Sequence, residues 1–302
     1  VWGGQFVVGK SALGTENAFP LSTIRYAAAA LLWVALLALV EGRGSLRLDG
    51  RGRSLLWLGS LGFAGFNLLT YSGLARARPQ SASLIVALAP LLTALVLWQR
   101  TRAAPSASTF ALLGVALAGV ALVISGGNPA SIVDGSIGWG DALVFGGVFS
   151  FVLYGLGATR FPDFSPLRYT ALTAALGWVT LAVATAAGVA FGLVPVPTGG
   201  QLWAVTPELA YLALPGAFVA VLTWNAAIRT IGAQNAVLFG NLIPVTTFAI
   251  ETVRGYRPGA VELAGAGLTI SALVANNLLA RRHAARPVRE QEAPQLELEA
   301  AA

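Results

Sequence analysis

One long stretch of this chain occurs twice, and the repetition limits what the chain can fold into. Residues 77–105 read ARPQSASLIVALAPLLTALVLWQRTRAAP, and residues 232–258 read GAQNAVLFGNLIPVTTFAIETVRGYRP. Each copy has a polar start, then a run of about twenty apolar residues interrupted by one proline, then an arginine. Such a run is long enough to cross a bilayer as a helix. A proline inside it is tolerated only where the freed backbone groups find partners or line a cavity.

Composition assigns the chain to the integral membrane proteins. Of its 302 residues, 56% are hydrophobic and 11% are charged, against roughly 25% charged residues in a typical soluble domain. In a soluble protein, a net charge of +6 would suggest binding to nucleic acid. Here the arginines lie in short loops, where lipid headgroups and membrane orientation explain them. There is no cysteine and only one histidine, His283, so we expect no disulfide, no metal site and no cofactor.

The apolar segments predict an all-α integral membrane protein with ten transmembrane helices. The first is expected to be a truncated helix, because at ~1.5 Å per residue it is too short to span alone. The ten segments cover about residues 1–13, 20–40, 54–75, 79–98, 107–125, 137–158, 166–193, 206–228, 232–251 and 260–280.

The order of the motifs predicts two five-helix repeats, in which Arg25 and Tyr26 match Arg168 and Tyr169. Because five crossings are an odd number, the second repeat must be inverted relative to the first. With the N-terminus inside, the inner segments hold twelve arginines and the outer loops hold four, so both termini are predicted to be cytoplasmic. The predicted parts are residues 1–125 (first repeat), 126–136 (linker), 137–282 (second repeat) and 283–302 (a basic, then disordered tail).

Pro90 and Pro244 are the expected hinges, or helix breaks, of the fourth and ninth segments. Proline has no amide donor, so the carbonyls four residues earlier, on Val86 and Gly240, lose their helical partners and could accept hydrogen bonds from a substrate ammonium. The alternative is a structural kink that a neighbouring helix satisfies. Matching broken helices in two halves of a chain are typical of transporter binding sites, which favours the functional interpretation.

The expected substrate-binding residues are polar and aromatic side chains in the middle of five segments. A buried amide in hydrocarbon is costly unless it is paired. Hydrogen bonding between helices therefore explains any one of them as well as substrate contact does, but their joint occurrence favours a shared cavity. These residues are Gln5, Asn67, Tyr71, Tyr154, Trp224, Asn225 and Asn241.

The charged residues near the segment ends have simpler explanations. Lys10 is expected to reach the outer interface with its long side chain. Arg25 and Arg168 are expected to be hydrated near the interface, or paired with Glu16 or Asp163. Three aromatic residues are expected to serve in packing or in interface belts, namely Trp2, Trp178 and Tyr211.

The pattern as a whole resembles the drug/metabolite transporter superfamily, in its EamA-like branch. The resemblance rests on the ten segments in two halves, on the opening WGGQFVVGKSAL followed by Pro20 and Arg25, and on the paired APLLTALV and IPVTTFAI. Residues 160–178 and 241–251 are similar to bacterial aromatic amino acid exporters. This resemblance implies export of amino acids through a central cavity, with the fifth and tenth segments at the periphery.

The predicted function is a secondary transporter that exports aromatic and other neutral amino acids across the cell inner membrane by alternating access. Tyr71, Tyr154 and Trp224 offer aromatic surface, and the neutral amides suit a zwitterion. An EamA-type exporter of other metabolites or drugs is the alternative; a channel or a membrane enzyme is less favoured, since no HExxH or GxSxG motif occurs. The expected partners are a small-molecule substrate and membrane lipid, not nucleic acid, and a monomer is compatible with the sequence.

Overall fold

The computed structural model describes the chain except residues 103, 127–137, 232–238 and 280–302. The residues that it describes form helices and loops without a strand. Among them, seven helices are long and apolar enough to cross a membrane, and Leu242–Val253 is a shorter apolar helix. The prediction of an all-helical membrane protein is therefore confirmed, whereas the count of ten helices stays a prediction. Apart from Gly126, the predicted linker lies outside the described residues, as does the predicted tail.

The helix bounds follow local chemistry where a capping residue is present. The Asn17 side chain accepts a hydrogen bond from the Phe19 amide at the start of α2, and Ser106 and Ser165 cap α7 and α10 in the same way. The elements are α1 (Trp2–Ala12), α2 (Ala18–Val40), η1 (Arg43–Leu46), α3 (Gly52–Gly59), η2 (Ser60–Gly65), α4 (Phe66–Leu74), α5 (Pro79–Ala87), α6 (Ala89–Thr101), α7 (Ala107–Ser125), α9 (Trp139–Gly157), η3 (Ala158–Arg160), α10 (Pro166–Ala190), α11 (Gly199–Ala204), α12 (Thr206–Ala213), η4 (Leu214–Val219), α13 (Ala220–Ile231), α15 (Leu242–Val253) and the C-terminal helix Ala260–Leu279.

Two segments that were expected to be plain α-helices contain a π-helical turn. The turn η2 joins α3 to α4, and η4 joins α12 to α13. A π turn disturbs the regular backbone ladder, so side chains of other helices can bond its carbonyls. Ser150 of α9 donates to the Leu61 carbonyl of η2 at 2.8 Å, and the Trp2 indole donates to the Gly216 carbonyl of η4 at 3.1 Å. Pro215, which has no amide donor, is a local reason for η4.

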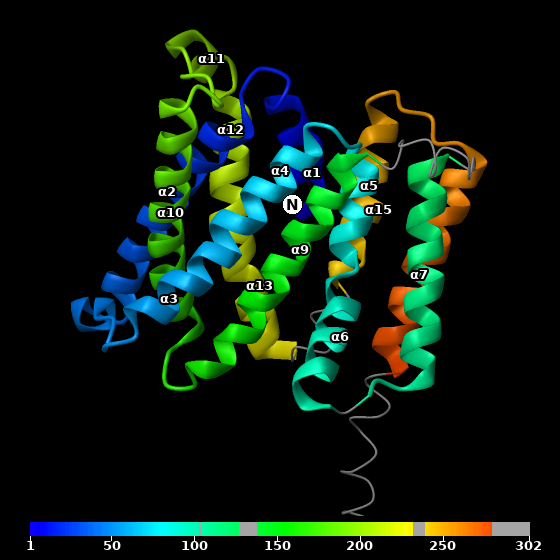
Figure 1. The fold of residues 1–302 in the computed structure, drawn as a ribbon, viewed down its shortest axis with the longest axis horizontal. Helices are drawn as coiled ribbons and strands as arrows, with labels where there is room; N and C mark the ends of the chain where they lie inside the picture. Colours follow the sequence, from blue (N-terminus) through cyan, green and yellow to red (C-terminus); the bar gives the residue numbers. More distant parts are fainter. Residues whose placement is uncertain (103, 127–137, 232–238, 280–302) are drawn as a thin grey trace, which may run out of the picture.

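Close helix contacts use glycine where two backbones meet. At the contact of α3 with α10, a Cβ on Gly59 would lie 2.2 Å from the Thr173 carbonyl oxygen. At one edge of the bundle, α7 lies beside the C-terminal helix Ala260–Leu279 (Figure 1), and the Thr269 hydroxyl donates to the Ala116 carbonyl at 3.2 Å. There a Cβ on Gly119 would lie 2.5 Å from the Gly265 carbonyl oxygen. Small residues thus let the backbones approach.

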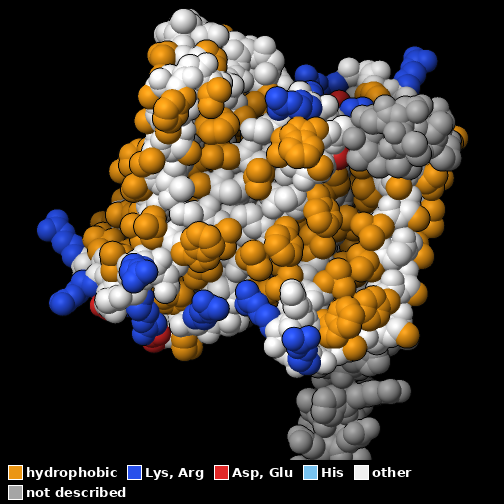
Figure 2. Space-filling view, in the orientation of Figure 1, with side chains coloured by type: hydrophobic (Ala, Val, Ile, Leu, Met, Phe, Trp, Pro, Cys, Tyr) orange, Lys and Arg blue, Asp and Glu red, His pale blue; other side chains and the backbone are white. Residues whose placement is uncertain are grey.

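The charged side chains lie on two rims with an apolar belt between them. Figure 2 shows lysine and arginine along both ends of the bundle and hydrophobic side chains across the surface between them. One rim carries the loop around η1 (Figure 1), and the other carries Arg78, which is paired with Glu262. This distribution suits a bilayer, in which charged groups stay near the headgroups.

The arginines of the η1 rim have partners that the sequence analysis did not anticipate. Arg51 pairs with Asp163 at 2.7 Å, and this hydrogen bond holds the pKa of the Asp163 carboxyl below its ordinary value. Arg168 pairs with Asp49 at 2.6 Å. Arg168 is therefore paired near the interface, as expected, but its salt-bridge partner is Asp49 and neither Glu16 nor Asp163. The loop between α2 and α3 folds back over the start of α10 and supplies the carboxylate of Asp49.

Candidate functional site

Arg25 lies two turns into α2 and is 2% exposed, so the expectation that it sits hydrated or paired near the interface is wrong. Its Nε donates to the Leu212 carbonyl at 3.0 Å, and its Nη1 donates to the Tyr71 hydroxyl. Its guanidinium carbon lies 5.0 Å from the centroid of the Tyr26 ring and 5.3 Å from that of Tyr71. No described aspartate or glutamate pairs with it. Its charge is therefore stabilised by neutral dipoles and rings.

Gln5 of α1 completes the surroundings of this charge. Only one of the two orientations of its amide group gives every neighbour a hydrogen-bond partner. In that orientation the oxygen accepts from Arg25 Nη1 at 3.3 Å and Nη2 at 2.8 Å, and the nitrogen donates to the Gly216 carbonyl at 3.2 Å. The Tyr71 hydroxyl lies 3.3 Å from the same amide. Gln5, Arg25, Tyr26 and Tyr71, here called the Arg25 cluster, thus connect α1, α2 and α4 with the π turn η4.

An aromatic pair borders this cluster on the side of η4. Trp2, which was expected to serve in packing or an interface belt, donates to the same Gly216 carbonyl as Gln5. Its ring centroid lies 5.3 Å from that of Trp224 of α13. The side chain of Asn225, the next residue of α13, lies outside the described residues. The structure therefore brings Gln5, Tyr71 and Trp224 into one neighbourhood.

Asn67 has an unused hydrogen-bond acceptor one helical turn before Tyr71 on α4. Its side chain is fully buried, and its Nδ2 donates to the Phe63 carbonyl of η2 at 2.8 Å. Its Oδ1 is buried without a partner among the described residues. A buried polar atom without a partner costs about 1–3 kcal/mol. The site therefore holds an acceptor that a bound ammonium or hydroxyl could satisfy.

Tyr154 is connected to the Arg25 cluster through Phe63, whose ring centroid lies 5.4 Å from that of Tyr26. The Tyr154 ring stacks on Tyr169 at a centroid distance of 5.3 Å and meets Phe63 edge-on, also at 5.3 Å. Its hydroxyl lies 3.3 Å from the Thr173 hydroxyl. The ring covers Gly62 of η2, where a Cβ would come within 2.4 Å of it. These contacts explain Tyr154 as core packing between α9, α10 and η2.

The remaining predicted residues, Pro90, Asn241 and Pro244, lie in the two proline-containing apolar segments. The first is interrupted at Leu88, where α5 ends, and Pro90 lies in the first turn of α6. The Leu88 amide, at the end of α5, donates to the Ile85 carbonyl at 3.1 Å, and the expectation that the Val86 carbonyl is available to a ligand stays a prediction. In the second copy, Asn241 immediately precedes α15, which contains Pro244 in its first turn. Asn241 is buried, and its Nδ2 has no partner among the described residues.

Lys10 bonds the end of α4, next to the rim that carries Arg78. Its ammonium donates to the carbonyls of Leu74, Ala75 and Ala77 at 2.8, 2.9 and 2.9 Å. The last carbonyls of a helix have no partners within the helix, and they carry partial negative charge. Lys10 is therefore a helix cap, a role that the sequence analysis missed.

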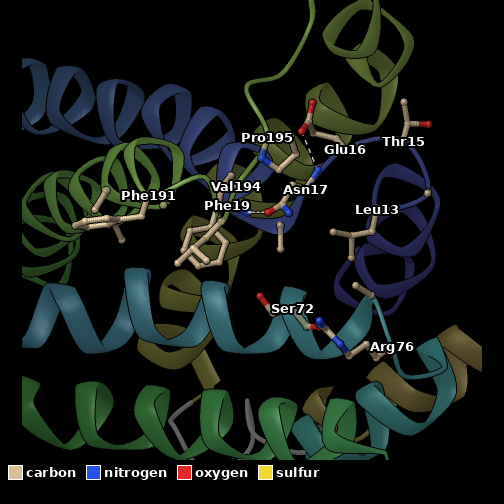
Figure 3. Close-up of a pocket in the computed structure, with 17 residues that line it drawn as sticks. Leu13, Thr15, Glu16, Asn17, Phe19, Ser72, Arg76, Phe191, Val194 and Pro195 are labelled. Carbon is tan, nitrogen blue, oxygen red and sulfur yellow. Dashed lines mark hydrogen bonds between the residues drawn. The ribbon is translucent and has the colours of Figure 1, made fainter.

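A pocket of about 820 Å³ opens at the end of the bundle where α1, α4 and α10 terminate. Figure 3 shows Glu16 and Asn17 on one side of it, and Ser72 of α4 and Arg76, just after α4, on the other. Phe19 adds an aromatic wall. None of the predicted site residues lines this pocket. The loop between α1 and α2 that forms it carries no repeat or motif that would have drawn attention to it.

The comparisons with known proteins agree with this architecture. The model of the EamA-like transporter family matches residues 1–125 and 138–278. The chain is 31% identical over 300 residues to the uncharacterized transporter YrdR of Bacillus subtilis (strain 168), covering 96% of this chain and 92% of that one. It is 32% identical over 274 residues to the uncharacterized transporter YyaM of the same organism, covering 89% and 87%. A solved crystal structure shares 21% identity and a TM-score of 0.60, covering 93% of this chain and 96% of the other, which shows a common fold.

Proposed function

The chain belongs to the EamA-like transporter family of the drug/metabolite transporter superfamily, and on this premise we propose that it is a secondary carrier that exports aromatic and other neutral amino acids. Membership in the family makes it a multi-pass membrane transporter of a small molecule, not an enzyme. The observation that carries the finer proposal is the unsatisfied Asn67 amide beside Tyr71, with the Trp2–Trp224 pair in the same neighbourhood. Hydrogen-bonding groups beside aromatic rings suit a zwitterion with an apolar side chain.

We propose ten transmembrane helices in two inverted repeats, residues 1–125 and 137–282, in the inner membrane. Pro90 and Pro244 would then break equivalent helices, one in each half, as the two helices that flank a midplane site do in carriers of this kind. The excess of arginine on the loops of the η1 rim supports cytoplasmic termini. A monomer suffices for this scheme.

Because the chain has no native cysteine, its orientation can be tested with single cysteines. Gly44 lies in the loop between α2 and α3, and Gly199 begins α11; a Cβ at either position would meet nothing within 4 Å. In intact cells, a membrane-impermeant maleimide should label Gly199→Cys and spare Gly44→Cys. Inside-out vesicles should reverse the pattern. Labelling of both positions from the same side would contradict the proposed topology.

Transport by the purified protein in liposomes tests the function. We expect saturable flux and counterflow of labelled phenylalanine and threonine, because a carrier binds each solute before moving it. Trp224→Ala and Asn67→Ala should lower phenylalanine flux about tenfold, since they remove aromatic surface and a polar contact. Trp203→Ala is the matched control, because Trp203 is 81% exposed on α11.

The same assay separates the alternatives. Flux of a cationic drug without amino acid flux would assign the protein to drug export. Flux that does not saturate and shows no counterflow would indicate a channel. Normal phenylalanine flux in Trp224→Ala and Asn67→Ala together would contradict the proposed site.

A further inference from the structure

We propose that Arg25 is the residue on which the substrate carboxylate docks, so that the protein selects solutes that carry a carboxylate. This inference rests on the proposed function and assigns its specificity to one side chain. It begins from charge. Arg25 is 2% exposed in a membrane-spanning helix, and no described carboxylate pairs with it. An ionised group inside a membrane protein is costly unless it is paired, and it marks a functional site by default.

The neutral partner of Arg25 occupies the position that a carboxylate would take. The Gln5 amide oxygen accepts from Nη1 and Nη2 together, at 3.3 and 2.8 Å. These two nitrogens form the fork that binds carboxylates in protein structures, where both hydrogen bonds are charge-assisted. An amide oxygen satisfies the fork without neutralising its charge. A carboxylate that replaced Gln5 would supply both the hydrogen bonds and the countercharge.

The other contacts of Arg25 hold this fork in place. Nε is bonded to the Leu212 carbonyl, and the rings of Tyr26 and Tyr71 lie against the guanidinium. These contacts, and the hydrogen bond from Nη1 to the Tyr71 hydroxyl, fix the guanidinium. The second N–H of Nη1 and those of Nη2, which now face the Gln5 oxygen, are left to bind a ligand. The unsatisfied Asn67 oxygen lies about one helical turn from Tyr71 on the same helix face. It is an acceptor for the ammonium of an amino acid whose carboxylate sits on Arg25.

Displacement of the Gln5 amide from Arg25 would also affect the π turn η4. The Gln5 nitrogen bonds the Gly216 carbonyl, so a carboxylate that displaces the amide from Arg25 also weakens the link between α1 and η4. The Trp2 indole is the other side-chain donor to that carbonyl. Docking on Arg25 therefore changes how α1 is held against α12 and α13, which is the kind of local change that a carrier needs to reopen its site.

The rival explanation is a purely structural brace between α2, α4 and α12. The equivalent arginine of the second half, Arg168, is such a brace: it bonds the carbonyls of Ser45 and Arg47 and pairs with Asp49 at the rim. It offers a matched control, since Arg25 and Arg168 occupy the same position of the repeat. If Arg25 binds the substrate carboxylate, replacing Arg25 should weaken binding only of solutes that carry a carboxylate. If Arg25 is a structural brace, the replacement should affect all solutes alike.

The test uses the full chain in liposomes and in detergent, with phenylalanine, 3-phenylpropionate, phenylalaninamide and phenethylamine as probes. In the unsubstituted protein, phenylalanine and 3-phenylpropionate, which carry a carboxylate, should bind at least about tenfold more tightly than phenylalaninamide and phenethylamine, which do not. Arg25→Gln should raise the half-saturating concentration of both carboxylates about tenfold or more. It should change binding of the other two probes less than about twofold, and Arg25→Lys should lie between the two proteins. Arg168→Gln should keep the original selectivity.

Each outcome decides between the two proposals. Equal loss for all four probes in a folded Arg25→Gln protein would overturn the docking role and leave a brace. If the variant does not fold, thermal stabilisation of the unsubstituted protein by the four probes decides: equal stabilisation by phenethylamine and phenylalanine overturns the inference. Binding of 3-phenylpropionate without phenylalanine would contradict amino acid export while supporting the Arg25 site. Binding of neither carboxylate would contradict both.

Discussion

Replacement of Gln5 by glutamate is expected to stabilise the protein and to abolish transport of carboxylate substrates. The glutamate would place a permanent carboxylate on Nη1 and Nη2 of Arg25, where the amide oxygen now lies. Because the charge of Arg25 is already buried, pairing it should outweigh the loss of the hydrogen bond from the Gln5 nitrogen to the Gly216 carbonyl, which keeps the Trp2 indole as a donor. We expect a net stabilisation of about 1 kcal/mol. The same carboxylate would exclude that of the substrate. Thermal unfolding in detergent and phenylalanine flux in liposomes should therefore move in opposite directions.

Gln5→Leu provides the matching control for stability. It removes the acceptor of Arg25 and the donor to the Gly216 carbonyl without adding a charge. Loss of a neutral hydrogen-bond partner of a buried charged group costs roughly 1.5–3 kcal/mol, so this variant should unfold at a lower temperature than the original protein. Unchanged phenylalanine flux in Gln5→Glu would show that the substrate does not use this position.

Gly59→Val is expected to destabilise the protein by ~3 kcal/mol or more, because it places a branched side chain between two backbones. A Cβ on Gly59 would lie 2.2 Å from the Thr173 carbonyl oxygen and 2.9 Å from the Gly177 amide nitrogen. Backbone atoms inside helices cannot move aside as a flexible side chain can. The temperature at which the protein loses its monodisperse elution in detergent measures the effect.

Gly155→Val in α9 is the matched substitution, because a Cβ there meets nothing within 4 Å. It should leave the unfolding temperature nearly unchanged. Equal destabilisation by the two variants would show that the loss comes from valine in a helix and not from the contact of α3 with α10.

The apolar segments were predictable because a bilayer allows few local solutions. In hydrocarbon each backbone group must be satisfied within its own helix, so hydropathy alone locates the spans. The segment expected at 107–125 is α7, Ala107–Ser125, and the segment expected from 166 begins α10 at Pro166. Capping serines and the first-turn proline are local signals of this kind. The π turns were missed because a pattern of apolar residues looks the same whether or not the ladder inside it is regular.

The sequence by itself determined that the chain is a helical membrane protein with a repeated pattern, because hydropathy and repetition depend on local composition alone. It also contained Gln5, Tyr71 and Trp224 as candidates for one site. Only the tertiary structure decided which side chains meet. Arg25 is bonded to Leu212 and Tyr71, which are 187 and 46 residues away along the chain, and Lys10 caps a helix that ends 64 residues later. The depth of Arg25 and the cap made by Lys10 depend on such distant partners, and no short window of sequence contains both members of these pairs. The packing of Tyr154 on Tyr169 and the burial of Asn67, whose Nδ2 bonds the Phe63 carbonyl four residues before it, were likewise decided by how the helices pack.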